Sequence, residues 1–150
     1  MISEICHVYS LKVYLEDTDL GGIVYHSKYL NFAERARSEL LLSMGFNFSN
    51  LDNNINLFFV VKNMKINYIK PAYLHDDINV RTKVTNIKGA RLELVQQIIR
   101  NNSSLAELDS TLALVNSIGK PKKIPTKLYK ALLSKIYCNI KNSGDMIDGK

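Results

Sequence analysis

Two carboxylates and two glycines stand close together near the start of the chain, in the segment Glu16-Asp17-Thr18-Asp19-Leu20-Gly21-Gly22. A carboxylate just before a glycine bend can be held over a pocket, because glycine adopts backbone conformations that other residues avoid. The amides that open a following helix favour negative charge in the same space. Asp19 can therefore act as a general base on water, or as a nucleophile, in an acyl-transfer reaction.

Such a reaction also needs donors where the carbonyl oxygen becomes negative. The backbone N–H groups around Tyr25 and His26, at the expected helix start, can fill this role without any side chain. The His26 imidazole could transfer a proton near neutral pH, or it could orient water or Asp19. Both roles of His26 stay open, as do the general-base and mixed-anhydride routes for Asp19.

A simpler interpretation is that Asp17 and Asp19 only cap a helix or satisfy turn amides, as acidic residues before helices commonly do. A metal site would gather Asp17, Asp19 and His26, or alternatively the residues 75–77, but neither set has a recognised ligand spacing. We therefore expect no metal and no separate cofactor.

The candidate residues lie between a predicted strand and a predicted helix. Leu11, Val13 and Leu15 alternate with polar residues, which is the period of a half-buried strand that ends at the acidic turn. From about Ser27 to Met44, apolar residues recur at helical spacing, and Gly45 supplies a helix stop.

Four further strands are predicted after this helix. Their ranges are Leu57 to Ile69, Ile78 to Ile87, Arg91 to Arg100 and Ala106 to Asn116. Short polar breaks at residues 88–90 and 101–104 are typical of antiparallel hairpins. The stripe Phe58, Val60, Met64 and Ile66 is expected in the sheet core. One helix with four or five antiparallel strands indicates an α+β architecture.

The last part of the chain predicts a C-terminal amphipathic helix, with apolar residues from Leu128 to Ile140. We expect one domain over residues 1–150, with a frayed tail from about residue 142. Cys6 and Cys138 are expected as free thiols. No apolar run approaches the roughly 20 residues needed to cross a bilayer, and we see no secretory signal. A cytoplasmic location is the expectation.

The same residues carry a family resemblance. The run 16–26, Tyr29, Glu34-Arg35-Ala36-Arg37, the run 67–72 and the acidic turn Asp76-Asp77 closely resemble hotdog-fold acyl-CoA thioesterases of the 4-hydroxybenzoyl-CoA thioesterase class. The resemblance is closest to the YbgC branch, which is associated with the Tol-Pal cell-envelope system. It runs from about Val8 to Ile140. Leu20 departs from the pattern, since relatives often carry a smaller or different residue there.

The resemblance implies a bent antiparallel sheet of about five strands wrapped around one long helix. It also implies that Asp19 is catalytic while Asp17 braces the loop, with His26 beside the thioester. Gly22 and Tyr29 are expected to contact substrate, although the apolar helical face of Tyr29 makes packing the first explanation. Coenzyme A would be part of the substrate rather than a cofactor.

A net charge of +6 favours anionic partners, such as nucleic acid, an acidic lipid surface, an acidic carrier protein or the phosphates of coenzyme A. Lys88 and Arg91 flank a hairpin and could meet those phosphates, although solvated turn charges are nearly as good an interpretation. The basic run 120–123 has no interleaved aromatics, so no nucleic-acid site is expected. An acyl-carrier-protein substrate stays open, and the family implies a homo-oligomer, either a dimer or a tetramer.

Two other functions compete with thioester hydrolysis. A hotdog hydratase would add water to an enoyl-CoA, but it needs a differently spaced Asp and His pair. A non-catalytic module would bind acyl-CoA or acyl carrier protein for the envelope machinery. The presence of Asp19 favours hydrolysis to free CoA and a carboxylic acid.

Overall fold

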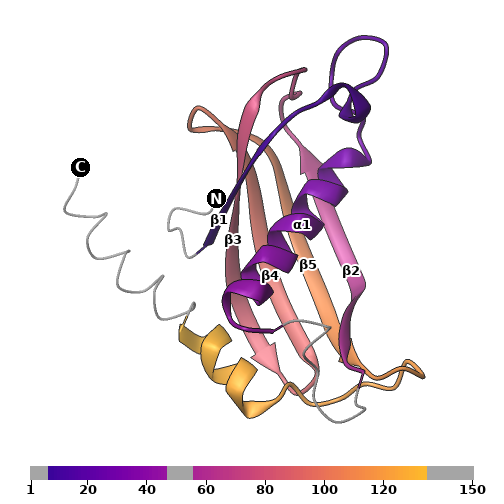
Figure 1. Cartoon of the computed structure of the whole chain (residues 1–150), viewed down its shortest axis with the longest axis vertical. Helices are drawn as coiled ribbons and strands as arrows, with labels where there is room; N and C mark the ends of the chain where they lie inside the picture. Colours follow the sequence, from indigo (N-terminus) through magenta and orange to yellow (C-terminus); the bar gives the residue numbers. More distant parts are fainter. Residues whose placement is uncertain (1–6, 47–55, 135–150) are drawn as a thin grey trace, which may run out of the picture.

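The computed structural model describes residues 7–46 and 56–134, in which one antiparallel sheet is crossed on one face by a long helix (Figure 1). The strand order is β1-β3-β4-β5-β2, so β1 and β2 form the two edges. The strands are β1 (His7–Lys12), β2 (Phe58–Tyr68), β3 (Asp77–Lys88), β4 (Arg91–Arg100) and β5 (Ser103–Val115). This arrangement confirms the predicted α+β class and its sheet of about five strands.

Helix α1 (Lys28–Ser43) confirms the helix predicted from apolar spacing. Its buried face is formed by Tyr29, Phe32, Ala33, Ala36, Arg37, Leu40 and Leu41. The helix stops because Gly45, with φ of 79°, adopts the left-handed conformation that closes many helix ends.

The β4–β5 turn is tighter than the sequence suggested. Asn101 and Asn102 both have positive φ, of 49° and 63°, which is the backbone of a two-residue hairpin turn whose twist suits the flanking strands. Asparagine tolerates this conformation better than most residues. Strand β5 therefore begins at Ser103, three residues before the predicted Ala106.

The first strand also differs from the prediction. Strand β1 ends at Lys12, and the short 3₁₀ helix η1 (Leu15–Asp17) follows. Val13 is fully buried, but Leu15 is 74% exposed. The apolar alternation through Leu15 was misleading because the Asp17 carboxylate accepts a hydrogen bond from the Tyr14 amide and bends the chain into a turn.

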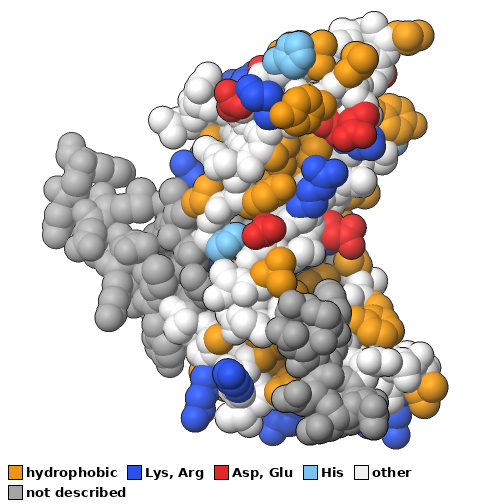
Figure 2. Space-filling model, in the orientation of Figure 1, with side chains coloured by type: hydrophobic (Ala, Val, Ile, Leu, Met, Phe, Trp, Pro, Cys, Tyr) orange, Lys and Arg blue, Asp and Glu red, His pale blue; other side chains and the backbone are white. Residues whose placement is uncertain are grey.

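Strand β2 is an exposed edge rather than a core strand. The predicted core stripe is wrong at Val60, which is 38% exposed, and the neighbouring Val61 is 48% exposed. Met64 and Ile66 do pack against the core, but only partly buried. Figure 2 shows hydrophobic side chains along the edge of the molecule where β2 runs. A register shift in β2 lies between Val61 and Asn63. The core-packed residues of this segment are Leu57 and Phe59 before the shift and Met64 and Ile66 after it, so an unbroken alternation mispredicts Val60.

A belt of buried polar residues divides the core between α1 and the sheet. This polar belt consists of Arg37, Thr82, Gln96 and Ser110. On each of β3, β4 and β5, the belt residue stands between a residue of one apolar cluster and a residue of the other. The Gln96 side chain accepts a hydrogen bond from Arg37 at 3.0 Å and donates to the Thr82 hydroxyl at 3.1 Å.

A second helix covers residues 126–134, which agrees with the start of the predicted C-terminal helix. Leu128 and Leu132 from this helix are buried. The rest of that prediction, including Ile140, both cysteines and the tail from residue 142, lies outside the described residues. Within the described residues, no helix is long and apolar enough to cross a membrane.

Candidate active site

The segment that carries the candidate residues folds back on itself as a small antiparallel ladder before α1. Backbone hydrogen bonds of 2.9 Å join the Asp19 amide to the Ile23 carbonyl and the Tyr25 amide to the Asp17 carbonyl. Thr18 and Val24 form an isolated bridge between them. The ladder therefore holds Asp19 at the tip of the loop. It also places Asp17, which follows β1, beside Tyr25, which precedes α1.

The tip itself is a three-residue connection closed by Asp19. The Gly22 amide donates to the Asp19 carbonyl at 3.0 Å, and Gly22 has a φ of 76°. A left-handed residue in this last loop position is typical of three-residue hairpins, and glycine adopts it at the lowest cost. Gly22, predicted to contact substrate, thus has a clear conformational role in the loop.

The two carboxylates of the motif have different surroundings. Asp17 is 4% exposed and its Oδ2 accepts the Tyr14 amide at 2.9 Å. Asp19 is exposed, and its Oδ1 accepts the Gly21 amide at 2.9 Å. The other Asp19 oxygen, Oδ2, accepts no hydrogen bond from the described residues. Each carboxylate satisfies one turn amide through one oxygen, but only Asp19 is exposed and therefore accessible to a substrate.

The helix start offers free amides beside the loop. Because the Tyr25 amide already donates to Asp17, it is committed to the ladder. Within the described residues, the amides of His26 and Ser27 donate to no acceptor. Of the two donors predicted from the sequence, the one at His26 is available. The Tyr25 ring, whose residue is 49% exposed, lies 4.4 Å from the His26 ring between centroids.

A second loop, residues 69–76, holds the first one in place. The Val24 amide donates to the Ala72 carbonyl at 2.9 Å, and the Leu74 amide donates to the Gly22 carbonyl at 3.0 Å. The Ala72 amide in turn donates to the Tyr29 hydroxyl oxygen at 2.9 Å. Tyr29 is 3% exposed, and burial raises the pKa of its hydroxyl. It therefore joins the helix, the loop and the core.

The second loop is fastened by an ion pair that the sequence did not reveal. The Arg100 guanidinium, at the end of β4, pairs with the Asp76 carboxylate and donates to the Pro71 carbonyl at 3.1 Å. It also lies over the Tyr73 ring, 5.4 Å from the centroid. The resemblance covered the acidic turn that contains Asp76, but no local signal pairs it with a residue 24 positions away.

Tyr68 is the other residue that sequence reasoning missed. It ends the edge strand β2, and its hydroxyl donates to the His26 carbonyl at 2.8 Å. Its ring also meets the Tyr29 ring edge-on, at 5.4 Å between centroids. No local pattern could show this contact, because the two hydrogen-bonded residues are 42 positions apart.

Lys88 and Arg91 lie at the far end of the sheet from Asp19 (Figure 1). They flank the β3–β4 hairpin, whereas the Asp19 loop packs near the beginning of β3, where Lys12 pairs with Asp77. The 12 residues of β3 span roughly 36 Å. The structure of the single chain thus brings Asp19, Tyr25, His26, Gly22 and Tyr29 together but leaves these two basic residues apart from them.

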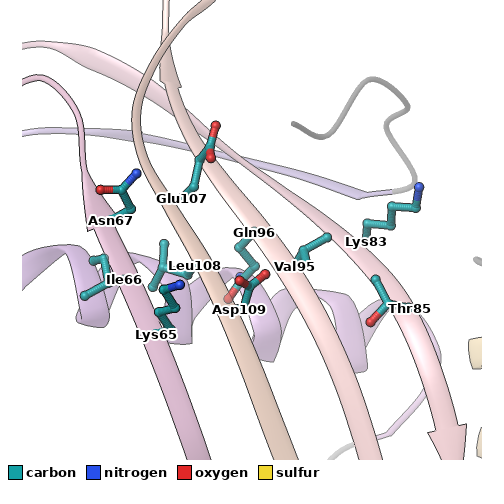
Figure 3. Close-up of a pocket in the computed structure, with 10 residues that line it drawn as sticks. All are labelled: Lys65, Ile66, Asn67, Lys83, Thr85, Val95, Gln96, Glu107, Leu108 and Asp109. Atoms are coloured by element: carbon teal, nitrogen blue, oxygen red, sulfur yellow. The ribbon is translucent and has the colours of Figure 1, made fainter.

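The most evident hollow also lies elsewhere. One hollow, of about 630 Å³, is lined by residues of β2, β3, β4 and β5, and Figure 3 shows α1 behind the sheet there. Its charged lining side chains are Lys65, Lys83, Glu107 and Asp109. It does not include Asp19 or His26, and both of these residues are exposed in the single chain. Within the described residues, no group of three His, Cys, Asp or Glu side chains could hold a metal ion.

Comparison with known proteins adds independent evidence. A model of the thioesterase-like superfamily matches residues 13–132. The acyl-CoA thioesterase YbgC of Haemophilus influenzae is 40% identical over 77% of this chain and 85% of its own length. The acyl-CoA thioester hydrolase YbgC of Escherichia coli is 36% identical over 79% of this chain and 89% of its own length.

A solved structure agrees with this relationship. The crystal structure of a probable thioesterase from Bartonella henselae superposes with a TM-score of 0.76 and 39% identity, over 79% of this chain and 98% of that one. The residues that the family model matches, 13–132, include the Asp19 loop, α1 and strands β2 to β5, and they begin directly after β1. The chain therefore belongs to the thioesterase-like superfamily and has its hotdog fold.

Proposed function

We propose that this protein hydrolyses acyl-CoA thioesters to free CoA and a carboxylic acid. The names of the YbgC relatives, at 35% to 40% identity, support this activity. The observation that carries the proposal is the different use of the two loop carboxylates. Each accepts one turn amide, but Asp17 is buried, whereas Asp19 is exposed at the loop tip.

In the proposed reaction, water or Asp19 itself attacks the thioester carbonyl carbon. As a general base, Asp19 takes a proton from the attacking water; as a nucleophile, it forms a mixed anhydride that water then opens. The His26 amide donates to the carbonyl oxygen as it becomes negative, and the C–S bond breaks to release the CoA thiol. The His26 side chain would orient water or Asp19 beside the thioester.

The open site leads us to propose that two copies of the chain close it. Strand β2 leaves one long edge of the sheet unpaired, and an exposed edge with apolar side chains favours pairing with another chain. Because Tyr68 connects this edge to His26, pairing along β2 would place a second chain beside the site. Such a dimer would cover the loop and shield the thioester from bulk solvent while leaving room for the reacting water.

Thiol release from a panel of acyl-CoA substrates tests the activity. The panel should run from short aliphatic through aromatic to long-chain acyl groups, with acyl carrier protein thioesters as a parallel set. Asp19→Asn should keep the fold and lower kcat by about 10² to 10⁴, since the amide cannot accept the proton or attack the carbonyl. The matched control is Asp109→Asn, which should keep full turnover. Asp109 is an exposed aspartate on β5.

Three outcomes would contradict the proposal. Near-normal turnover by Asp19→Asn would remove that residue from the chemistry. Hydration of an enoyl-CoA without thiol release would indicate a hydratase. Tight acyl-CoA binding with no turnover across the panel would indicate a binding module.

A further inference from the structure

The hydroxyl of Tyr68 makes the only side-chain hydrogen bond that the described residues give to the peptide between His26 and Ser27. This peptide stands at the start of α1, directly after the loop that carries Asp19. Ser27 is the residue before the helix, and its side chain makes no capping hydrogen bond. The turn and helix backbone hold the chain on either side, through hydrogen bonds from the Lys28 amide to the Tyr25 carbonyl and from the Leu30 amide to the Ser27 carbonyl. Tyr68 adds a contact to this peptide from the end of β2.

Because a peptide unit is rigid, the contact at its C=O also determines the direction of its N–H. A trans peptide is planar, so its N–H points away from its C=O. The Tyr68 hydroxyl approaches the His26 carbonyl at 2.8 Å, and the Ser27 N–H consequently points away from Tyr68. That N–H donates to no described residue. A hydrogen bond accepted by the carbonyl also polarises the amide and makes its N–H a stronger donor.

The surroundings of Tyr68 hold its hydroxyl in position. Its ring packs edge-on against Tyr29, which is 3% exposed and anchored by its own bond to the Ala72 amide. The backbone of Tyr68 is paired with Ala106 on β5. Although Tyr68 is 46% exposed, these contacts therefore hold both its ring and its backbone in place.

From these contacts we infer that Tyr68 is a positioning residue for the proposed thioester hydrolysis. Its hydroxyl orients the 26–27 peptide so that the Ser27 amide joins the His26 amide as a donor to the developing oxyanion. Tyr68 would act through this peptide and not by touching the reacting atoms. The inference rests on the proposed function, and it adds a donor and its support to that site.

Tyr68→Phe is the direct test, because it removes only the hydroxyl and keeps the ring contact with Tyr29. We expect kcat to fall about ten-fold, since a loosened oxyanion donor costs less than a deleted one, while KM stays within about two-fold. The melting temperature should fall by no more than about 4 °C. Tyr73→Phe is the matched control, because it removes an exposed tyrosine hydroxyl on the adjacent loop and should change neither constant.

A second measurement follows the Ser27 amide directly and does not depend on enzymatic activity. In an NMR spectrum, Tyr68→Phe should shift the Ser27 amide resonance more than those of residues in the middle of α1, and Tyr73→Phe should not. Unchanged kcat in Tyr68→Phe, or an unchanged Ser27 resonance, would overturn the inference. A wild-type protein that releases no thiol would instead overturn the proposed function, and the shifted resonance would then still support the orienting contact.

Discussion

At the scale of single residues, Asp17 and Asp19 are only two positions apart but have different surroundings. Asp17 is buried and its carboxylate accepts the Tyr14 amide where η1 begins. Within the described residues, the Asp19 carboxylate bonds only the Gly21 amide, and Asp19 is exposed. Because the Asp17 bond is partly buried and the Asp19 bond is exposed, losing the first should cost more stability, and the two residues should separate stability from turnover.

Asp17→Ala should therefore lower the free energy of unfolding by about 1 to 3 kcal/mol, because the Tyr14 amide loses its acceptor. Asp17→Asn keeps an oxygen in place and should recover most of that loss. Urea denaturation of both variants measures the difference. Equal stability of wild type and Asp17→Ala would show that the bond does not brace the loop.

At the scale of elements, the polar belt fixes how α1 lies on the sheet. Arg37 from the helix meets Gln96 from β4, and the Gln96 amide also donates to the Ala33 carbonyl at 3.0 Å. Burial lowers the pKa of the Arg37 guanidinium, since the charge is desolvated without a carboxylate bonded to it. Apolar side chains can slide past one another, whereas these hydrogen bonds form at only one position of the helix.

Gln96→Leu should destabilise the protein by about 3 kcal/mol, because it leaves the buried Arg37 charge without its acceptor. The double variant Arg37→Met with Gln96→Leu removes both groups and should be more stable than Gln96→Leu alone. A double-mutant cycle by chemical denaturation measures the coupling, expected at about 1 to 3 kcal/mol. Additive effects would show that the two residues act independently.

At the scale of the whole molecule, the two edges of the sheet are not equivalent. Strand β2 is joined to the candidate site through Tyr68, whereas β1 lies at the other edge. If two copies pair along β2 as proposed, a charge at this edge should affect both assembly and turnover. The same charge at β1 should affect neither.

Val61→Lys on β2 should shift the protein toward monomers, because it places like charges of two copies near Lys62 and Lys65. Turnover should fall with it, since each site would stay open. Val8→Lys on β1, at a similarly exposed valine, is the control. Sedimentation velocity with a parallel thiol-release assay gives both readouts. A Val61→Lys dimer with full activity would contradict pairing along β2.

The sequence by itself determined the elements and their chemistry. Apolar spacing located α1, β2 and β3 within one residue at each end, and it located both ends of β4 correctly, because these periods are local properties of the chain. The Asp19 loop was recognised in the same way, since its carboxylates and glycines are adjacent in sequence. Local reasoning erred at Leu15 and at the start of β5, where a turn replaced the expected pattern.

Only the tertiary structure decided which strand became an edge and which distant residues support the loop. Val60 and Met64 have the same apolar character in sequence, yet a register shift between Val61 and Asn63 leaves Val60 exposed and Met64 packed against the core. Tyr68 and Arg100 reach the candidate site across 42 and 24 positions respectively. Such contacts depend on strand order and register, which are set by the packing of the whole sheet against α1 and not by any local pattern.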